Sequence, residues 1–91
     1  MRIFEWDPDK ADANFAKHGI DFEDAARLFQ EPHVTYESPR ADEARSVSIG
    51  YLGTSAVAVV WTLRGDDTLR IISARSARRE EREAYRQRIG K

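Results

Sequence analysis

The 91-residue sequence contains no cysteine, so it has neither a disulfide framework nor a reactive thiol. Its two histidines, His18 and His33, do not have the spacing of metal ligands, and no carboxylate cluster completes a metal site. The longest apolar run, residues 56–61, is a strand's length and cannot span a bilayer. The N-terminus turns acidic at once and does not resemble a signal peptide. We therefore expect one domain over residues 1–91, in the cytoplasm, with no cofactor, metal or membrane contact.

Two helices are predicted in the first third of the chain. Asp7-Pro8 is typical of a helix start, and Gly19 of the residue that ends a helix. Asp21 begins a second helix, with Asp24 in a variant of the capping box, and its apolar residues recur at the spacing of a packed helical face. Pro32 ends this helix.

After residue 32 the apolar residues alternate with polar ones, which predicts strands. Turns at residues 53–54 and 65–67 predict antiparallel neighbours, and residues 37–44 read as an exposed loop. The predicted fold is α+β: a short N-terminal strand, two helices, a four-stranded antiparallel meander and a C-terminal helix. We expect the helices to lie against one side of the sheet.

Positive charge is concentrated at the end of the chain. Residues 1–44 carry 5 basic and 11 acidic groups, whereas residues 70–91 carry 8 basic and 3 acidic groups. The last strand is predicted to stop at Ala74 and the last helix to begin at Ser76, with arginines crowded at the junction. Cations beside a helix N-terminus are unfavourable unless an anion, such as a phosphate, binds there. The alternative is a solvated helix whose Arg79 and Glu83 pair at i,i+4.

The residues that could carry chemistry are a lysine, a histidine, a tyrosine and several strand-end arginines. A metal-free ribonuclease needs cations to hold the phosphate, a base for the 2′-hydroxyl and an acid for the leaving oxygen. Arginines supply the first requirement, and His, Lys or Tyr the others. The predicted catalytic residues are Lys17, His18, Arg64, Arg75 and Tyr85, and the predicted RNA-binding residues are Arg45, Arg78, Arg79 and Arg82. Lys17 and His18 also have a purely structural interpretation, because cations stabilise a helix C-terminus.

A series of short motifs runs along nearly the whole chain. The first half carries Phe4-Glu5-Trp6-Asp7-Pro8-Asp9-Lys10, Asn14, Lys17-His18-Gly19-Ile20 and Phe29-Gln30-Glu31-Pro32. The second half carries Arg45, Thr62-Leu63-Arg64-Gly65, Arg70-Ile71-Ile72-Ser73-Ala74-Arg75, Arg78-Arg79-Glu80 and Tyr85. In combination and order, these motifs resemble the BrnT family of toxins from type II toxin–antitoxin systems.

The resemblance implies a RelE-like fold and a metal-independent endoribonuclease that restrains translation by cleaving RNA. It also implies a BrnA-like antitoxin, a heterotetramer formed through antitoxin dimerisation, and contact with DNA only through that antitoxin. A different class stays open: a non-catalytic module that docks an antitoxin-like protein, since the apolar stripe of the last helix is thin. Direct DNA binding is disfavoured, because no helix-turn-helix pattern occurs and the net charge is −1.

Overall fold

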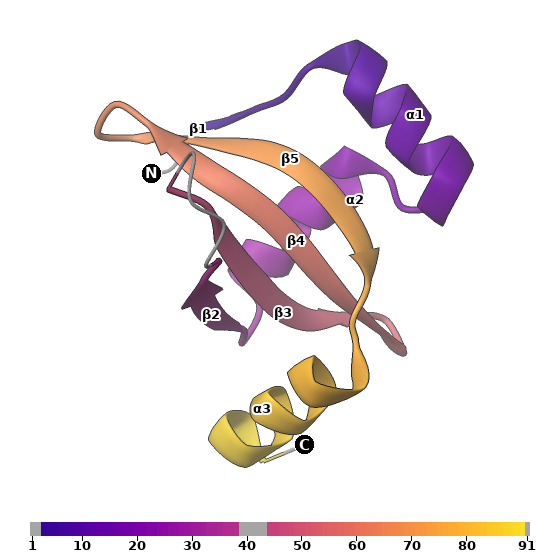
Figure 1. Cartoon of the computed structure of the whole chain (residues 1–91), viewed down its shortest axis with the longest axis vertical. Coiled ribbons are helices and arrows are strands. Elements are labelled where there is room, and N and C mark those ends of the chain that lie inside the picture. Colours follow the sequence, from indigo (N-terminus) through magenta and orange to yellow (C-terminus); the bar gives the residue numbers. More distant parts are fainter. Residues whose placement is uncertain (1–2, 39–43, 91) are drawn as a thin grey trace.

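The computed structural model describes residues 3–38 and 44–90, which form a sheet flanked by helices (Figure 1). The elements, in chain order, are β1 (Ile3–Glu5), α1 (Pro8–His18), α2 (Phe22–Arg27), the 3₁₀ turn η1 (Leu28–Gln30), β2 (Val34–Glu37), β3 (Ser46–Leu52), β4 (Ser55–Arg64), β5 (Thr68–Ser76) and α3 (Arg79–Ile89). The five strands of the sheet have the order β1-β5-β4-β3-β2.

The predicted four-stranded antiparallel meander is present as β2 to β5. The first strand joins it alongside β5 in parallel orientation, with Ile3 opposite Thr68, so the sheet is mixed. Residue 37, predicted to begin a loop, ends β2 instead, and residues 39–43 of that loop lie outside the described residues. The RelE-like comparison stays a prediction.

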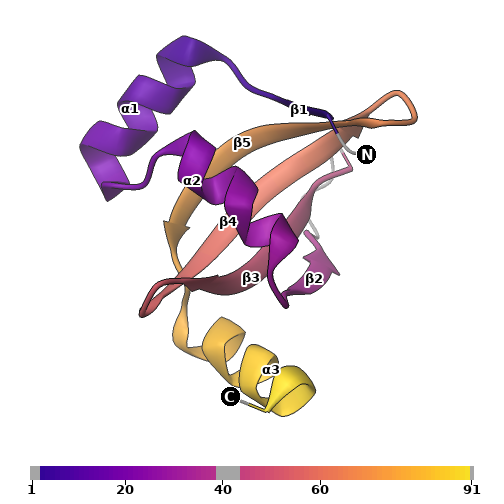
Figure 2. The ribbon, with the colours of Figure 1, turned by 180° about the vertical axis from the view of Figure 1, so that it is seen from behind.

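The expectation that the helices share one side of the sheet is wrong. Val57 and Val59 of β4 pack with buried residues of α2, whereas Ala58 between them packs with Tyr85 of α3. Neighbouring residues of a strand point to opposite faces, so α2 and α3 cover different faces. Figure 2 shows α2 crossing the sheet, with α3 displaced toward one end. We call the two surfaces the α2 face and the α3 face.

The first helix begins and ends as its sequence predicts. The Asp7 carboxylate accepts the N–H of Asp9 at 2.9 Å, and Gly19 adopts a φ of 71°, a conformation that glycine reaches without strain. Asp21 lies at the N-cap of α2 without a side-chain hydrogen bond, so the predicted capping-box variant is absent there. That helix is only six residues long and continues as η1.

One side chain attaches α1 to the edge of β5. The strand β1 pairs with β5 only as far as Arg70, which leaves the rest of that edge without a strand. Buried Asn14 contacts it instead: its Nδ2 donates to the carbonyl of Ala74 at 2.9 Å, and its Oδ1 accepts the Ala74 N–H at 3.1 Å. The amide therefore satisfies two backbone groups that would otherwise be buried without partners.

The junction before α3 differs from its predicted boundaries. The strand β5 continues to Ser76, which pairs with Val57, and the helix begins at Arg79 instead of Ser76. Pairing with β4 keeps the backbone extended for two residues more than the apolar pattern indicates. Ala77 and Arg78 then connect strand and helix.

Candidate active site

A cavity of about 300 Å³ lies on the α3 face, where the helix leaves part of the sheet uncovered. Three arginines and a tyrosine reach it: Arg45 precedes β3, Arg75 is the last residue but one of β5, Arg78 precedes α3 and Tyr36 belongs to β2. The complete lining is Tyr36, Ser38, Arg45, Val47, Val60, Ser73, Arg75 and Arg78. Its size is at the lower end of small-molecule sites, and its charge suits an anion.

A β-bulge turns Arg75 toward this cavity. Ile71 lies opposite Trp61 and Ser73 lies opposite Val60, so one extra residue of β5 is inserted between them. Ile71 and Ala74 consequently both pack on the α2 face, although they are three positions apart. The insertion exchanges the faces of all residues after it, and bulges commonly redirect side chains next to active sites.

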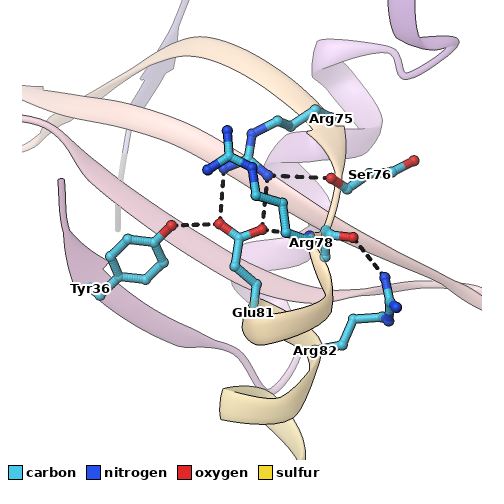
Figure 3. A network of polar contacts seen from close by, with 7 residues as sticks. Tyr36, Arg75, Ser76, Arg78, Glu81 and Arg82 are labelled. Carbon is cyan, nitrogen blue, oxygen red and sulfur yellow. Dashed lines mark hydrogen bonds and ion pairs between the residues drawn. The ribbon is translucent and has the colours of Figure 1, made fainter.

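Within the site, Arg75 forms a bidentate ion pair with Glu81 of α3 (Figure 3). Its Nη1 donates to Oε1 at 2.8 Å and its Nη2 donates to Oε2 at 2.9 Å. The same carboxylate accepts the backbone N–H of Arg78 at 2.8 Å and the hydroxyl of Tyr36 at 2.5 Å. The contact with Arg78 is the glutamate half of a capping box; an arginine side chain cannot supply the other half, because it has no acceptor.

Glu81 is ionised because these donors outweigh the cost of its burial. Only 5% of its side chain is exposed. Burial by itself raises the pKa of Glu81, but the hydrogen bonds from Arg75, Arg78 and Tyr36 lower it to about 2. For Tyr36, burial and then the hydrogen bond to Glu81 raise the pKa above its usual value, so its hydroxyl keeps its proton at neutral pH.

The anion expected at the strand–helix junction is therefore supplied in part by the chain itself. The carboxylate of Glu81 offsets the positive charge of Arg75, with which it pairs. A buried ion pair is weak evidence for stability, because desolvation opposes the attraction. The guanidinium groups of Arg45 and Arg78 also line the cavity, and such groups suit a phosphate.

The family model described as "Ribonuclease toxin, BrnT, of type II toxin-antitoxin system" matches residues 6–81. The chain belongs to this family. It is therefore an endoribonuclease toxin of a toxin–antitoxin system, with RNA as its substrate and an antitoxin as its partner. No curated protein matches the sequence.

A BrnT structure supports the same assignment. The crystal structure of the Brucella abortus ribonuclease toxin BrnT matches this structure with a TM-score of 0.71 and 33% sequence identity, over 87% of this chain and 100% of that chain. No described helix combines the length and apolar character needed to cross a membrane. Within residues 3–38 and 44–90, no group of three or more His, Cys, Asp or Glu side chains is arranged to hold a metal ion.

Some of the residues predicted for catalysis and RNA binding line the cavity, and others do not. Arg75 lines the cavity, as do Arg45 and Arg78 from the predicted RNA-binding set. Lys17 and His18 are exposed at the end of α1, outside the cavity lining.

The other predicted residues lie away from the cavity. Arg64 is 3.9 Å from Glu5 near the far end of β4. Tyr85 is buried beneath α3 against Tyr51, with ring centroids 5.2 Å apart, and lines a different cavity. Arg79 and Arg82 are exposed on α3.

Tyr36 and Glu81 are the members of the site that the sequence did not indicate. They are 45 positions apart and meet only because α3 packs across β2 and β3. The sequence holds a signal for Glu81, because it lies four positions from both Ala77 and Tyr85 and is a charged residue on the thin apolar stripe of the last helix. A charge on a buried stripe requires a partner, and Arg75 six positions earlier satisfies this requirement.

Proposed function

We propose that the cavity on the α3 face cleaves RNA without a metal ion, using the RNA's own 2′-hydroxyl as the nucleophile. The observation that carries this proposal is the convergence of Arg45, Arg75, Arg78 and Tyr36 on one cavity. Three guanidinium groups suit a phosphodiester, and they would repel a divalent cation.

In the proposed reaction, the 2′-hydroxyl loses its proton to a water molecule, because no side chain that lines the cavity is an unprotonated base, and O2′ attacks the adjacent phosphorus. The P–O5′ bond breaks, and the leaving O5′ receives a proton. The products are a 2′,3′-cyclic phosphate and a 5′-hydroxyl. The arginines stabilise the charge that builds up on the non-bridging oxygens, which is the largest protein contribution in reactions of this type.

Tyr36 is the proposed donor of the proton to O5′. Its raised pKa keeps the hydroxyl protonated, and it lines the same cavity as Arg75. The hydroxyl hydrogen points to Oε2 of Glu81 in this structure, so the transfer requires it to turn from Glu81 to O5′, and water then reprotonates the tyrosinate. Glu81 is excluded as the base, because a carboxylate with a pKa of about 2 and four hydrogen bonds has little affinity for another proton. Lys17 and His18 lie outside the cavity lining and take no step in this reaction.

Arg64 and Arg70 are proposed to bind the RNA strand outside the cavity. Alternation along β4 and β5 puts both on the α3 face, opposite Thr68 and Thr62 respectively. Five positions separate Arg70 from Arg75, roughly 17 Å of extended chain. A single RNA strand lying along β5 would pass from one group of cations to the other.

We propose that the partner is a BrnA-like antitoxin. Dimerisation of the antitoxin would join two toxins into a heterotetramer, and the antitoxin would make the contacts with DNA. The family assignment supports an antitoxin, and the RNA substrate favours action in the cytoplasm. Co-expression of the pair followed by mass measurement on a sizing column tests the stoichiometry: two copies of each chain agree with the proposal, and any other ratio contradicts it.

The reaction is tested with purified toxin, EDTA and a short RNA that contains one cleavage site. We expect cleavage to continue in EDTA and to leave 2′,3′-cyclic phosphate ends. A matched RNA with a single 2′-deoxy residue at that site should stay intact. Cleavage of the deoxy RNA, or full inhibition by EDTA that added Mg²⁺ reverses, would refute the proposal.

A further inference from the structure

We infer that Glu81 is a positioning residue: it holds Arg75 by one edge of its guanidinium group, so that the other edge is presented to the scissile phosphate. This inference rests on the proposed function of the cavity. Glu81 is an acidic residue in a basic site. A carboxylate that only competed with the phosphate for the arginines would weaken phosphate binding. The nitrogen atoms that Glu81 contacts determine which edge of Arg75 faces the phosphate.

A guanidinium group offers two edges, each of which can bind an oxyanion through two N–H groups. The edge formed by Nη1 and Nη2 is taken, at 2.8 and 2.9 Å, by Glu81. Nη1 makes one further contact, at 3.3 Å, with the carbonyl of Ser76. Between the described residues, no hydrogen bond from Nε of Arg75 is found. The hydroxyl of Tyr36 also interacts with the guanidinium group, so a phosphate would bind the edge formed by Nε and Nη2 beside that hydroxyl.

Glu81 itself is not free to leave. Its side chain is 5% exposed, and its backbone belongs to the first turn of α3, which it caps through the N–H of Arg78. A phosphate that displaced it would leave a buried carboxylate without its main cation, at a large cost. The pair therefore fixes Arg75 before RNA binds and reduces the side-chain entropy that binding must overcome.

The same carboxylate orients Tyr36. The tyrosine hydroxyl donates to Oε2, the oxygen that also accepts from Nη2 of Arg75. One buried group thus sets the relative position of the phosphate-binding cation and the proposed proton donor. An error of about 1 Å in such an arrangement can reduce a rate by a factor of about 100.

Glu81→Gln tests the inference, with Glu80→Gln as the matched control. Both substitutions remove one negative charge from the first turn of α3, but Glu80 is exposed and Glu81 is buried. Glutamine still accepts the N–H of Arg78, yet its amide cannot accept from Arg75 and Tyr36 together. We expect E81Q to lower kcat by about 10- to 100-fold with a much smaller change in KM, and E80Q to leave both near the wild-type values.

A wild-type or higher kcat for E81Q would overturn the inference, because that is the result for a carboxylate that only competes with phosphate. The proposed function fails separately: if Arg75→Lys cleaves RNA at the wild-type rate, the cavity is not the site, whatever E81Q does. A loss in Arg75→Lys combined with full activity in E81Q rejects the positioning role alone.

A second measurement uses the wild-type protein and so does not depend on the folding of E81Q. The protein is titrated with a 2′-deoxy dinucleotide while the arginine side-chain N–H signals are followed by NMR. We expect the Nε–H signal of Arg75 to shift, and its Nη signals to stay separate because Glu81 still holds them. Merging of the Nη signals on binding would show that the phosphate displaces Glu81, which contradicts the inference.

Discussion

The two faces of the sheet are covered to different degrees. On the α2 face, Phe22 and Leu28 are fully buried against β4 and β5, and α1 closes the edge of β5 through Asn14. On the α3 face, the helix lies beside β2 and β3 (Figure 1). The same face holds a cavity lined by arginines. The difference indicates a division of roles: the closed face supplies stability, and the partly open face binds the substrate.

The strongest test of this division concerns stability alone. Phe22→Ala removes a ring that is 0% exposed and in edge contact with Trp6, at 6.1 Å between ring centroids. We expect it to lower the free energy of unfolding by about 3–5 kcal/mol, the usual cost for a buried Phe. Urea unfolding measures this loss.

The activity of the same variant sharpens the comparison. Per folded molecule, Phe22→Ala should cleave RNA near the wild-type rate at a temperature well below its unfolding midpoint, because Phe22 lies on the face opposite the cavity. A folded variant with a strongly reduced kcat would show that the two faces are not separate in function.

A smaller effect on stability should come from acid. The pKa of Glu81 is about 2 in the folded protein against an ordinary value of 4.5, so below pH 4.5 the unfolded chain binds the proton more readily. The stability that this group contributes is complete above about pH 5 and is lost as the pH falls toward 2; it is on the order of 3 kcal/mol.

Unfolding free energies measured from pH 7 to pH 2 check this expectation. The E80Q variant should lose stability over the same range as the wild type, whereas E81Q should have a flatter profile from a lower starting value. Equal slopes for E81Q and E80Q would mean that Glu81 does not carry the acid sensitivity.

His18→Ala should have the smallest effect on cleavage. A general base contributes about 10²- to 10⁴-fold to a rate, but His18 is exposed on α1 and lies outside the lining of the cavity. We expect a loss of less than about tenfold, since only long-range charge connects it to the site. A loss of 100-fold or more in a folded variant would extend the active surface around the edge of β5 to α1.

Local signals predicted the parts of the molecule that depend on neighbouring residues. Asp7-Pro8 and Gly19 bound α1 as expected, and the turns produce the antiparallel meander. The bulge at residues 71–73 was not predictable, because it depends on pairing with β4. Without the bulge, alternation would have turned Arg75 to the α2 face.

Contacts distant in sequence account for the rest of the site. The arginines at the strand–helix junction predict a bound anion, and the partner of Arg75 is an internal carboxylate. Tyr36 enters the site because β2 is an edge strand beneath α3, a position that only the strand order reveals. The division of the helices between the two faces has the same origin, since the apolar stripes of α2 and α3 do not specify which side they cover.

A single-turnover cleavage assay of Arg75→Lys beside Arg79→Lys shows whether RNA is cleaved at the cavity on the α3 face. Lysine keeps a cation next to Glu81 but cannot hold the carboxylate and a phosphate by two edges; Arg79 is exposed and outside the cavity lining, and receives the same change. We expect a rate about 10²- to 10³-fold lower for Arg75→Lys and a rate near wild type for Arg79→Lys. Equal rates for the two folded variants would contradict cleavage at this cavity.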